Sequence, residues 1–121
     1  MLFKDDFYTI ISSSQDEEAV TFAIQLNAEH AIFKGHFPDN PVTPGVAQME
    51  IVKELMKVHT DKDLALKSMG NCKFLAILNP ENDADVNVWL KISEQEDGSL
   101  KVAAVIKNET TSFLKMSAIY S

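Results

Sequence analysis

The sequence predicts an α+β fold in which a curved, mostly antiparallel sheet surrounds one helix. Residues 46–59 read as one almost wholly apolar helix, and short segments on both sides of it alternate apolar and polar residues. Turn signals such as Asp97-Gly98 separate these segments, so neighbouring strands are expected to pair antiparallel. The 121 residues suffice for one core without metal or disulfide support, and we expect residues 1–121 to form a single domain.

Two strands are predicted before the helix. Residues 7–12 form a short apolar run, which we expect to end in the turn-rich cluster of residues 12–16. Residues 19–26 alternate with period two, and every second residue from Val20 to Leu26 is a large apolar one. This pattern is typical of a half-buried strand whose apolar face lies on the core.

The helix follows a loop that is rich in proline and glycine. Thr43 is a candidate N-cap, and Pro44 suits the first helical position. Apolar side chains surround most of the helix axis, which indicates burial on most sides. Only three positions are expected to face water: Lys53, Glu54 and Lys57.

The second half of the chain reads as further strands. We expect one within residues 66–78, broken near Gly70, followed by a loop at residues 79–82. Three more are expected at residues 86–92, 100–107 and 111–120, which makes about five or six strands in all.

Composition excludes several classes of function. The net charge is -7 and all 11 basic residues are lysines, so the chain lacks the basic clusters that bind nucleic acid or an anionic membrane. The single cysteine cannot form an internal disulfide, and no cysteine and histidine spacing predicts a metal site. The first residues do not read as a signal peptide, and no apolar run is long enough to span a membrane. We therefore expect a cytoplasmic protein without a structural metal site.

The loop before the helix combines three groups suited to one chemistry. His36 lies in a proline-stiffened segment, and a fixed imidazole is a good general base. Gly45 lies in the first helical turn, where its N–H is free to polarise a carbonyl oxygen. Glu50 has apolar neighbours, and desolvation would keep it protonated as a general acid. A base, an acid and such a donor serve elimination or addition of water next to a carbonyl group.

Simpler interpretations of the same residues remain open. His36 taken alone is an ordinary loop histidine, and Glu50 taken alone is a surface residue that pairs with Lys53. The prolines at every third position from Pro38 to Pro44 are also typical of a polyproline ligand. The run ends directly in an apolar helix, which disfavours that last interpretation.

Together, however, these residues resemble the active-site motif of the 3-hydroxyacyl-acyl-carrier-protein dehydratases of hot-dog fold. The motif comprises Gly35-His36-Phe37-Pro38, then Pro41, Pro44-Gly45-Val46, and Glu50 fourteen residues after the histidine. The resemblance implies the hot-dog fold, a homodimer or dimer-based oligomer, and no cofactor. It also implies the removal of water from a (3R)-3-hydroxyacyl thioester, on acyl carrier protein or CoA, in fatty-acid or polyene and lipid biosynthesis.

The resemblance assigns roles residue by residue. His36 would remove the α-proton, Glu50 of the partner subunit would protonate the departing hydroxyl, and the Gly45 N–H would bind the thioester carbonyl. Phe37, Pro44 and Val46 would contact the substrate. Independently of the resemblance, local positive charge makes Lys34 and Lys73 the candidates for docking an acidic carrier protein. Relatives that also isomerise the double bond carry aspartate at the acid position, so Glu50 favours dehydration alone.

The sequence departs from the family pattern at two positions. Asp39 replaces the usual glycine after Phe37-Pro38, and Glu54 replaces the usual glutamine four residues after Glu50. A second carboxylate so close would raise the pKa of Glu50 if both were buried. The acidic chain is also a poor general attractor for an acidic carrier protein. Two alternatives therefore stay open: a hot-dog acyl-thioesterase, and a non-catalytic module that binds acyl thioesters.

Overall fold

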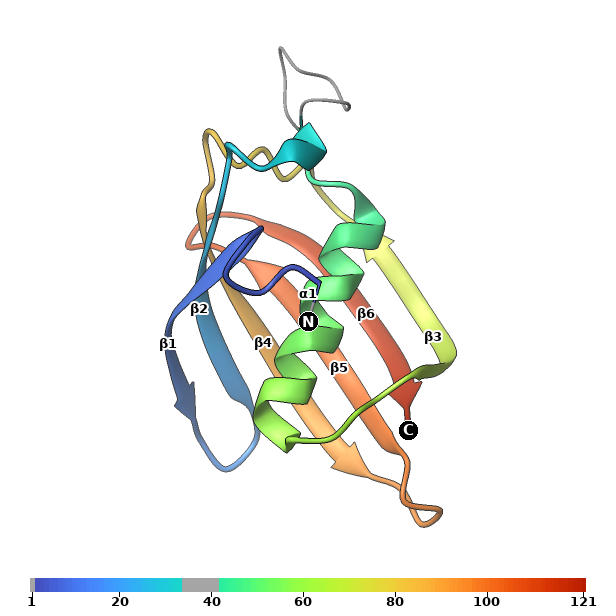
Figure 1. The fold of residues 1–121 in the computed structure, drawn as a ribbon. Helices are drawn as coiled ribbons and strands as arrows, with labels where there is room; N and C mark the ends of the chain where they lie inside the picture. Colours follow the sequence, from blue (N-terminus) through green and yellow to red (C-terminus); the bar gives the residue numbers. More distant parts are fainter. Residues whose placement is uncertain (1, 34–41) are drawn as a thin grey trace.

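The computed structural model describes residues 2–33 and 42–121, and it confirms the predicted α+β architecture. In these ranges a six-stranded antiparallel sheet with the strand order β1-β2-β4-β5-β6-β3 curves around the helix α1 (Figure 1). β1 and β3 are the two edge strands. The elements are β1 (Tyr8–Gln15), β2 (Val20–Leu26), the short 3₁₀ helix η1 (Ala31–Phe33), α1 (Gly45–Thr60), β3 (Leu66–Phe74), β4 (Asp85–Glu94), β5 (Leu100–Lys107) and β6 (Ser112–Tyr120).

The concave face of the sheet forms one half of the core. Phe22, Val88, Ile106 and Leu114 pair in register across β2, β4, β5 and β6, and all four are buried. The alternation expected in β2 is confirmed, because its buried positions are those from Val20 to Leu26 in steps of two. Period-two patterning therefore determines which face of the sheet is covered.

The helix α1 forms the other half of the core, and its exposed residues, Val46, Val58 and His59, lie near its two ends. Ile51, Val52, Leu55 and Met56 are fully buried. Val46, in contrast, is 76% exposed, so the expected burial on most sides does not extend to the first turn. One side of the helix is left uncovered there, since the sheet can cover only the face that it contacts.

Two further helix predictions are wrong. Glu54 was expected to face water, yet only 1% of it is exposed. Thr43 is not the N-cap, because Pro44 holds that position and no side chain caps the helix. The hydroxyl of Thr43 is buried and has no hydrogen-bond partner among the described residues.

The strand boundaries differ from the expectation mainly at β1. Its pairing with β2 continues to Gln15↔Val20, through the serine cluster that was expected to form a turn. An edge strand needs backbone pairing rather than apolar side chains, which explains why composition misplaced its end. The break near Gly70 is confirmed as a register shift between Met69 and Asn71, and Gly98 adopts the positive φ of 87° that a tight turn requires.

The N-terminal segment, residues 2–7, lies across α1 before it enters β1 (Figure 1). Its turn is closed by the carbonyl oxygen of Phe3, which accepts the N–H groups of Asp6 at 3.0 Å and Phe7 at 2.7 Å. Within the described ranges, no helix combines the length and the apolar character that crossing a membrane requires.

Candidate active site

Glu50 lies in the second turn of α1. It lines an open pocket of about 250 Å³ together with Val46, Met49, Lys53, Leu66 and Tyr120. The pocket therefore lies where the first turns of the helix meet β3 and the end of β6. It is largely apolar apart from the carboxyl group, the lysine and the phenol, so an aliphatic chain would suit it.

The environment of Glu50 favours its protonated form. Burial is the largest cause that raises its pKa, followed by a hydrogen bond to the Glu54 side chain and by the charge of Glu54. Lys53 and Lys57 act in the opposite direction and lower it. A carboxyl group with a raised pKa can donate a proton, which is what a general acid must do.

The carboxylate of Glu54 is hydrogen bonded to the N-terminal segment. Its Oε2 accepts the N–H of Phe3 at 3.0 Å, and its Oε1 accepts the N–H of Lys4 at 2.8 Å. Oε1 also accepts the phenol of Tyr8 at 3.0 Å. Three donors compensate for the desolvation of a buried carboxylate, which would otherwise be strongly unfavourable.

Gly45 begins α1, so its N–H is one of those without an acceptor inside the helix. The ring of Phe74, at the end of β3, covers this residue. A Cβ atom at position 45 would lie 2.6 Å from the Cζ of Phe74. A side chain at position 45 would therefore displace this ring, and the Gly45 amide lies beside an aromatic side chain that is itself 51% exposed.

The structure brings some of the predicted site residues together and leaves others undescribed. Pro44, Gly45, Val46 and Glu50 lie within the first turns of α1 and its cap. Three predicted residues lie outside the described ranges: Lys34, His36 and Phe37. Their roles in catalysis, substrate contact and docking stay predictions.

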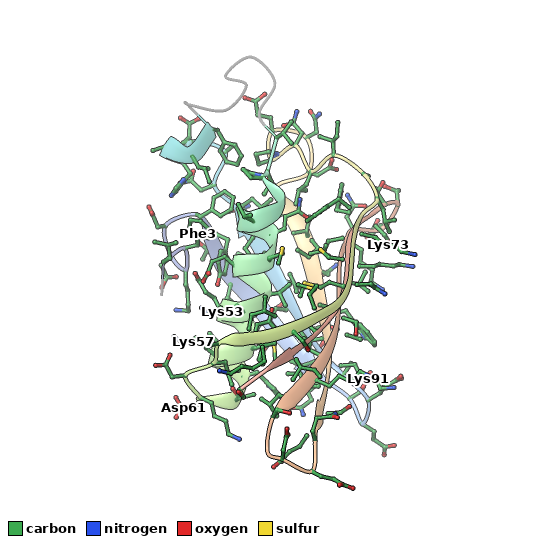
Figure 2. The ribbon with its side chains drawn as sticks, turned by 90° about the vertical axis from the view of Figure 1, so that its right-hand side faces the viewer. Phe3, Lys53, Lys57, Asp61, Lys73 and Lys91 are labelled. Carbon is green, nitrogen blue, oxygen red and sulfur yellow. The ribbon has the colours of Figure 1, made fainter. Side chains whose placement is uncertain are left out.

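Lys73 lies away from the pocket. It is directly opposite Lys115 of β6, whose neighbours Leu114 and Met116 are buried, so both lysines are on the outer face of the sheet. Figure 2 shows Lys73 and Lys91 on one side of the molecule, with Phe3 and Lys53 on the opposite, helix side.

Sequence reasoning missed two aromatic residues of the site. Phe74 covers Gly45, and Tyr120 lines the pocket beside Glu50. Burial and the charge of Glu50 raise the pKa of Tyr120 to about 12, so its phenol stays neutral near neutral pH. The alternation in residues 111–120 places Tyr120 on the inner face, but nothing local indicates that this face borders α1 at Glu50.

A larger open pocket, of about 550 Å³, lies elsewhere on the surface. It is formed by β2, β4 and two loops, and acidic side chains, among them Glu81, Asp83 and Asp85, line it. None of the predicted catalytic residues that the structure describes contributes to it. We therefore locate the candidate site at Glu50, where acid chemistry and an apolar wall coincide. Over the described part of the chain, no cluster of three or more histidine, cysteine or acidic residues could hold a metal ion.

Comparison with protein families identifies the chain. The sequence pattern of the ApeI-like family, described as ApeI dehydratase, matches residues 12–114. The chain belongs to the ApeI-like dehydratase family. It is also 21% identical over 109 residues to the 3-hydroxyacyl-[acyl-carrier-protein] dehydratase FabZ of Lactobacillus helveticus strain DPC 4571. The aligned region covers 84% of this chain and 74% of that protein.

Solved structures show the same fold. One is the dehydratase heterocomplex ApeI:P from Xenorhabdus doucetiae, with a TM-score of 0.67, 22% identity, and coverage of 93% of this chain and 96% of that chain. Another is an uncharacterised protein from Erwinia carotovora subsp. atroseptica, with a TM-score of 0.67, 21% identity, and coverage of 93% and 92%. The predicted hot-dog fold is thus confirmed.

The contact between Gly45 and Phe74 gives a stability prediction. Gly45→Ala should destabilise the protein by about 1–3 kcal/mol, because the new methyl group overlaps the ring. In a Phe74→Ala background the same change should be neutral or stabilising, because alanine favours helix. Urea unfolding of the four proteins in a double-mutant cycle measures this coupling. Equal effects of Gly45→Ala in both backgrounds would show that the ring does not restrict this position.

Proposed function

We propose that the protein removes water from a (3R)-3-hydroxyacyl thioester to give a trans-2-enoyl thioester. The observation that carries this proposal is Glu50, a carboxyl group with a raised pKa on the helix that begins with the Gly45 amide. An acid and a carbonyl-binding amide on one helix match the needs of this elimination. Membership of a dehydratase family supports the same reaction class.

In the proposed reaction, His36 takes the proton from the carbon next to the thioester carbonyl. The electrons move toward the carbonyl oxygen, where the N–H of Gly45 and the positive end of the helix dipole stabilise the charge. The carbon–oxygen bond at C3 then breaks while Glu50 protonates the departing hydroxyl, which leaves as water. The proton on His36 returns through solvent to the Glu50 carboxylate, so the enzyme is restored without a metal or cofactor. Phe37, Pro44 and Val46 contact the acyl chain.

We further propose that residues 1–121 form one hot-dog domain and that the site is completed by a second copy. β3 is an edge strand whose pairing within the chain is with β6. Large apolar side chains are exposed along this edge and at the start of the helix beside it: Val46, Leu66, Phe74, Leu75 and Ile77. An unpaired edge with an apolar margin favours association with another chain, and a two-fold arrangement would create two equal sites.

We propose acyl carrier protein as the carrier of the substrate, and Lys34 and Lys73 as its docking residues. Lys73 and Lys115 are like charges directly opposite each other, an arrangement that disfavours the sheet. An acidic partner would relieve this repulsion. The named activity of the FabZ relative, on acyl-carrier-protein substrates, supports this choice. We also propose that the reaction serves fatty-acid or polyene and lipid biosynthesis in the cytoplasm.

Turnover is the direct test of the proposal. The purified protein should hydrate a crotonyl thioester in the reverse direction, measured as loss of ultraviolet absorbance. His36→Ala and Glu50→Gln should each lower kcat by about 10²–10⁴-fold, because each removes a proton-transfer group. Unchanged circular dichroism controls for folding. Release of free thiol instead would indicate a thioesterase, and tight binding without turnover would indicate a binding module.

A mixing experiment tests whether the site is shared between two chains. His36→Ala and Glu50→Gln subunits are unfolded together and refolded, so that mixed dimers form. Such a dimer has one intact pair, with His36 from one chain and Glu50 from the other, and the mixture should recover roughly a quarter of wild-type activity. Each variant refolded alone should remain inactive. No recovery in a mixture shown to contain mixed dimers would place both residues of a site in one chain.

Carrier docking is tested with two charge reversals on the outer face. Lys73→Glu should raise KM for an acyl-carrier-protein substrate by about tenfold, since the change introduces repulsion at the docking surface. Lys101→Glu, an exposed lysine of β5, is the matched control and should have little effect. Both variants should treat a small pantetheine thioester like wild type. Equal effects of the two reversals on the carrier substrate would indicate net charge rather than a docking site.

A further inference from the structure

The contacts of Glu54 define its charge. Its two oxygens accept N–H groups from two different residues, Phe3 and Lys4. A backbone N–H can only donate, and a protonated carboxyl group would present a hydroxyl to one of the two. This pair of donors therefore selects the ionised carboxylate, and the Tyr8 phenol adds a third hydrogen bond to it.

Glu50 lies one helical turn before Glu54, so the two side chains are neighbours on the surface of α1, and a hydrogen bond to Glu54 is among the causes that raise the pKa of Glu50. Two carboxyl groups need a proton between them to form such a bond. Glu54 is committed to accepting, so the shared proton belongs to Glu50. The bond thus has a direction, with the Glu50 hydroxyl as donor and Glu54 as acceptor.

Other groups around the pair do not reverse this assignment. Tyr8 of β1 and Tyr120 of β6 stay neutral, since burial raises the pKa of each phenol, and burial also raises the pKa of the Cys72 thiol of β3. Lys53 and Lys57 of α1 favour ionised Glu50, but Lys57 is paired with Asp63 at 2.9 Å. Asp5, in the N-terminal segment, adds a further negative charge near Tyr8.

We propose that Glu54 is a positioning residue that holds the proton on Glu50 and fixes the direction of its carboxyl group. The inference rests on the proposed function, in which Glu50 is the acid. It also gives the N-terminal segment a role, because this segment supplies two of the three donors that keep Glu54 ionised.

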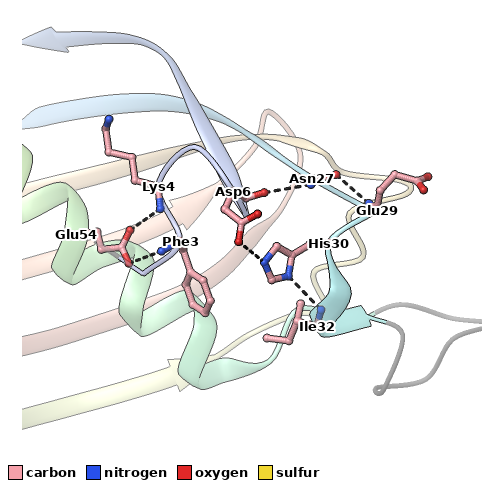
Figure 3. A network of polar contacts seen from close by, with 8 residues as sticks. All are labelled: Phe3, Lys4, Asp6, Asn27, Glu29, His30, Ile32 and Glu54. Carbon is pink, nitrogen blue, oxygen red and sulfur yellow. Dashed lines mark hydrogen bonds and ion pairs between the residues drawn. The ribbon is translucent and has the colours of Figure 1, made fainter.

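The N-terminal segment is itself held in place by a second set of contacts (Figure 3). His30 Nδ1 accepts the N–H of Ile32 at 3.1 Å, so its Nε2 carries the hydrogen and donates to Asp6 at 2.9 Å. The side chain of Asn27 donates to the Asp6 carbonyl at 3.1 Å. The donors of Glu54 are thus tied to the chain just before η1, and through it to the strand β2.

A glutamine at position 54 could not reproduce this arrangement. It has one acceptor oxygen and one NH₂ group, so either the Phe3 or the Lys4 N–H would face a donor. It also has no charge with which to hold the proton on Glu50. Glu54→Gln therefore separates the charge of this residue from its shape.

Carbon-13 NMR of protein labelled at the glutamate carboxyl carbons tests the inference without any substrate. In wild type, the Glu50 signal should titrate above the ordinary range for glutamate. In Glu54→Gln, the Glu50 titration should move to lower pH, because the negative acceptor is gone. Glu50→Gln identifies the Glu50 signal. A proton found on Glu54 in wild type, or an unmoved Glu50 titration in Glu54→Gln, would overturn the proposal.

The pH dependence of kcat for the dehydration of a 3-hydroxyacyl thioester provides the catalytic readout, because Glu50 acts as the acid in that direction. The acid must be protonated, so the rate falls as pH rises through the pKa of Glu50. In Glu54→Gln this alkaline limb should move to lower pH, so that rate is lost mainly at the alkaline end. A purely structural role would lower the rate by the same factor at every pH, and that result would contradict the proposal.

Tyr8→Phe is the matched control, because it removes one hydrogen bond from Glu54 and leaves its charge. It should lower thermal stability without moving the alkaline limb to lower pH. The same movement in both variants would overturn the proposal. If Glu54→Gln does not fold, the wild-type titration alone decides where the proton lies. Expected carboxyl titrations in a protein without turnover would refute the proposed function while supporting the proton placement.

Discussion

The burial of the Glu54 carboxylate is the constraint on which the candidate site depends. A charge with 1% exposure is tolerated only when donors replace water, and the chain supplies them from Phe3, Lys4 and Tyr8. Meeting this requirement pins the N-terminal segment across α1 and fixes the helix against β1. The same carboxylate lies one turn from Glu50, so a contact that holds the fold together also sets the protonation of the candidate acid.

The two edge strands of the sheet, β1 and β3, differ in what covers them. At the β1 end, the N-terminal segment connects the sheet to the helix. It is hydrogen bonded to Glu54 of α1 on one side and to Asn27 and His30 on the other. At β3, the edge and the neighbouring first turn of α1 leave apolar side chains exposed, and Phe74 approaches so closely that any side chain at position 45 would displace its ring. The open edge is thus the one beside Glu50, which is where a second chain could both bury apolar area and complete the site.

The charge distribution explains how an acidic chain could still receive an acidic partner. The net charge is -7, yet Lys73 and Lys115 are adjacent on the outer face of the sheet. The field at a docking surface is set by the charges within about one Debye length, about 8–10 Å in physiological salt, rather than by the total. A local pair of lysines therefore matters more for the encounter than the negative sign of the whole molecule.

The sequence by itself determined the α+β class, the inner face of β2, the turn at Gly98 and the motif from Gly35 to Glu50, because these depend on local periodicity and short-range spacing. Only the tertiary structure decided that Val46 is exposed, that Glu54 is buried and that Tyr120 reaches the pocket of Glu50. Each of these depends on which distant segment covers the helix. From local sequence, Glu54 looks like a surface residue of the helix. It can be buried only because Phe3 and Lys4, some fifty residues away in sequence, donate hydrogen bonds to its carboxylate.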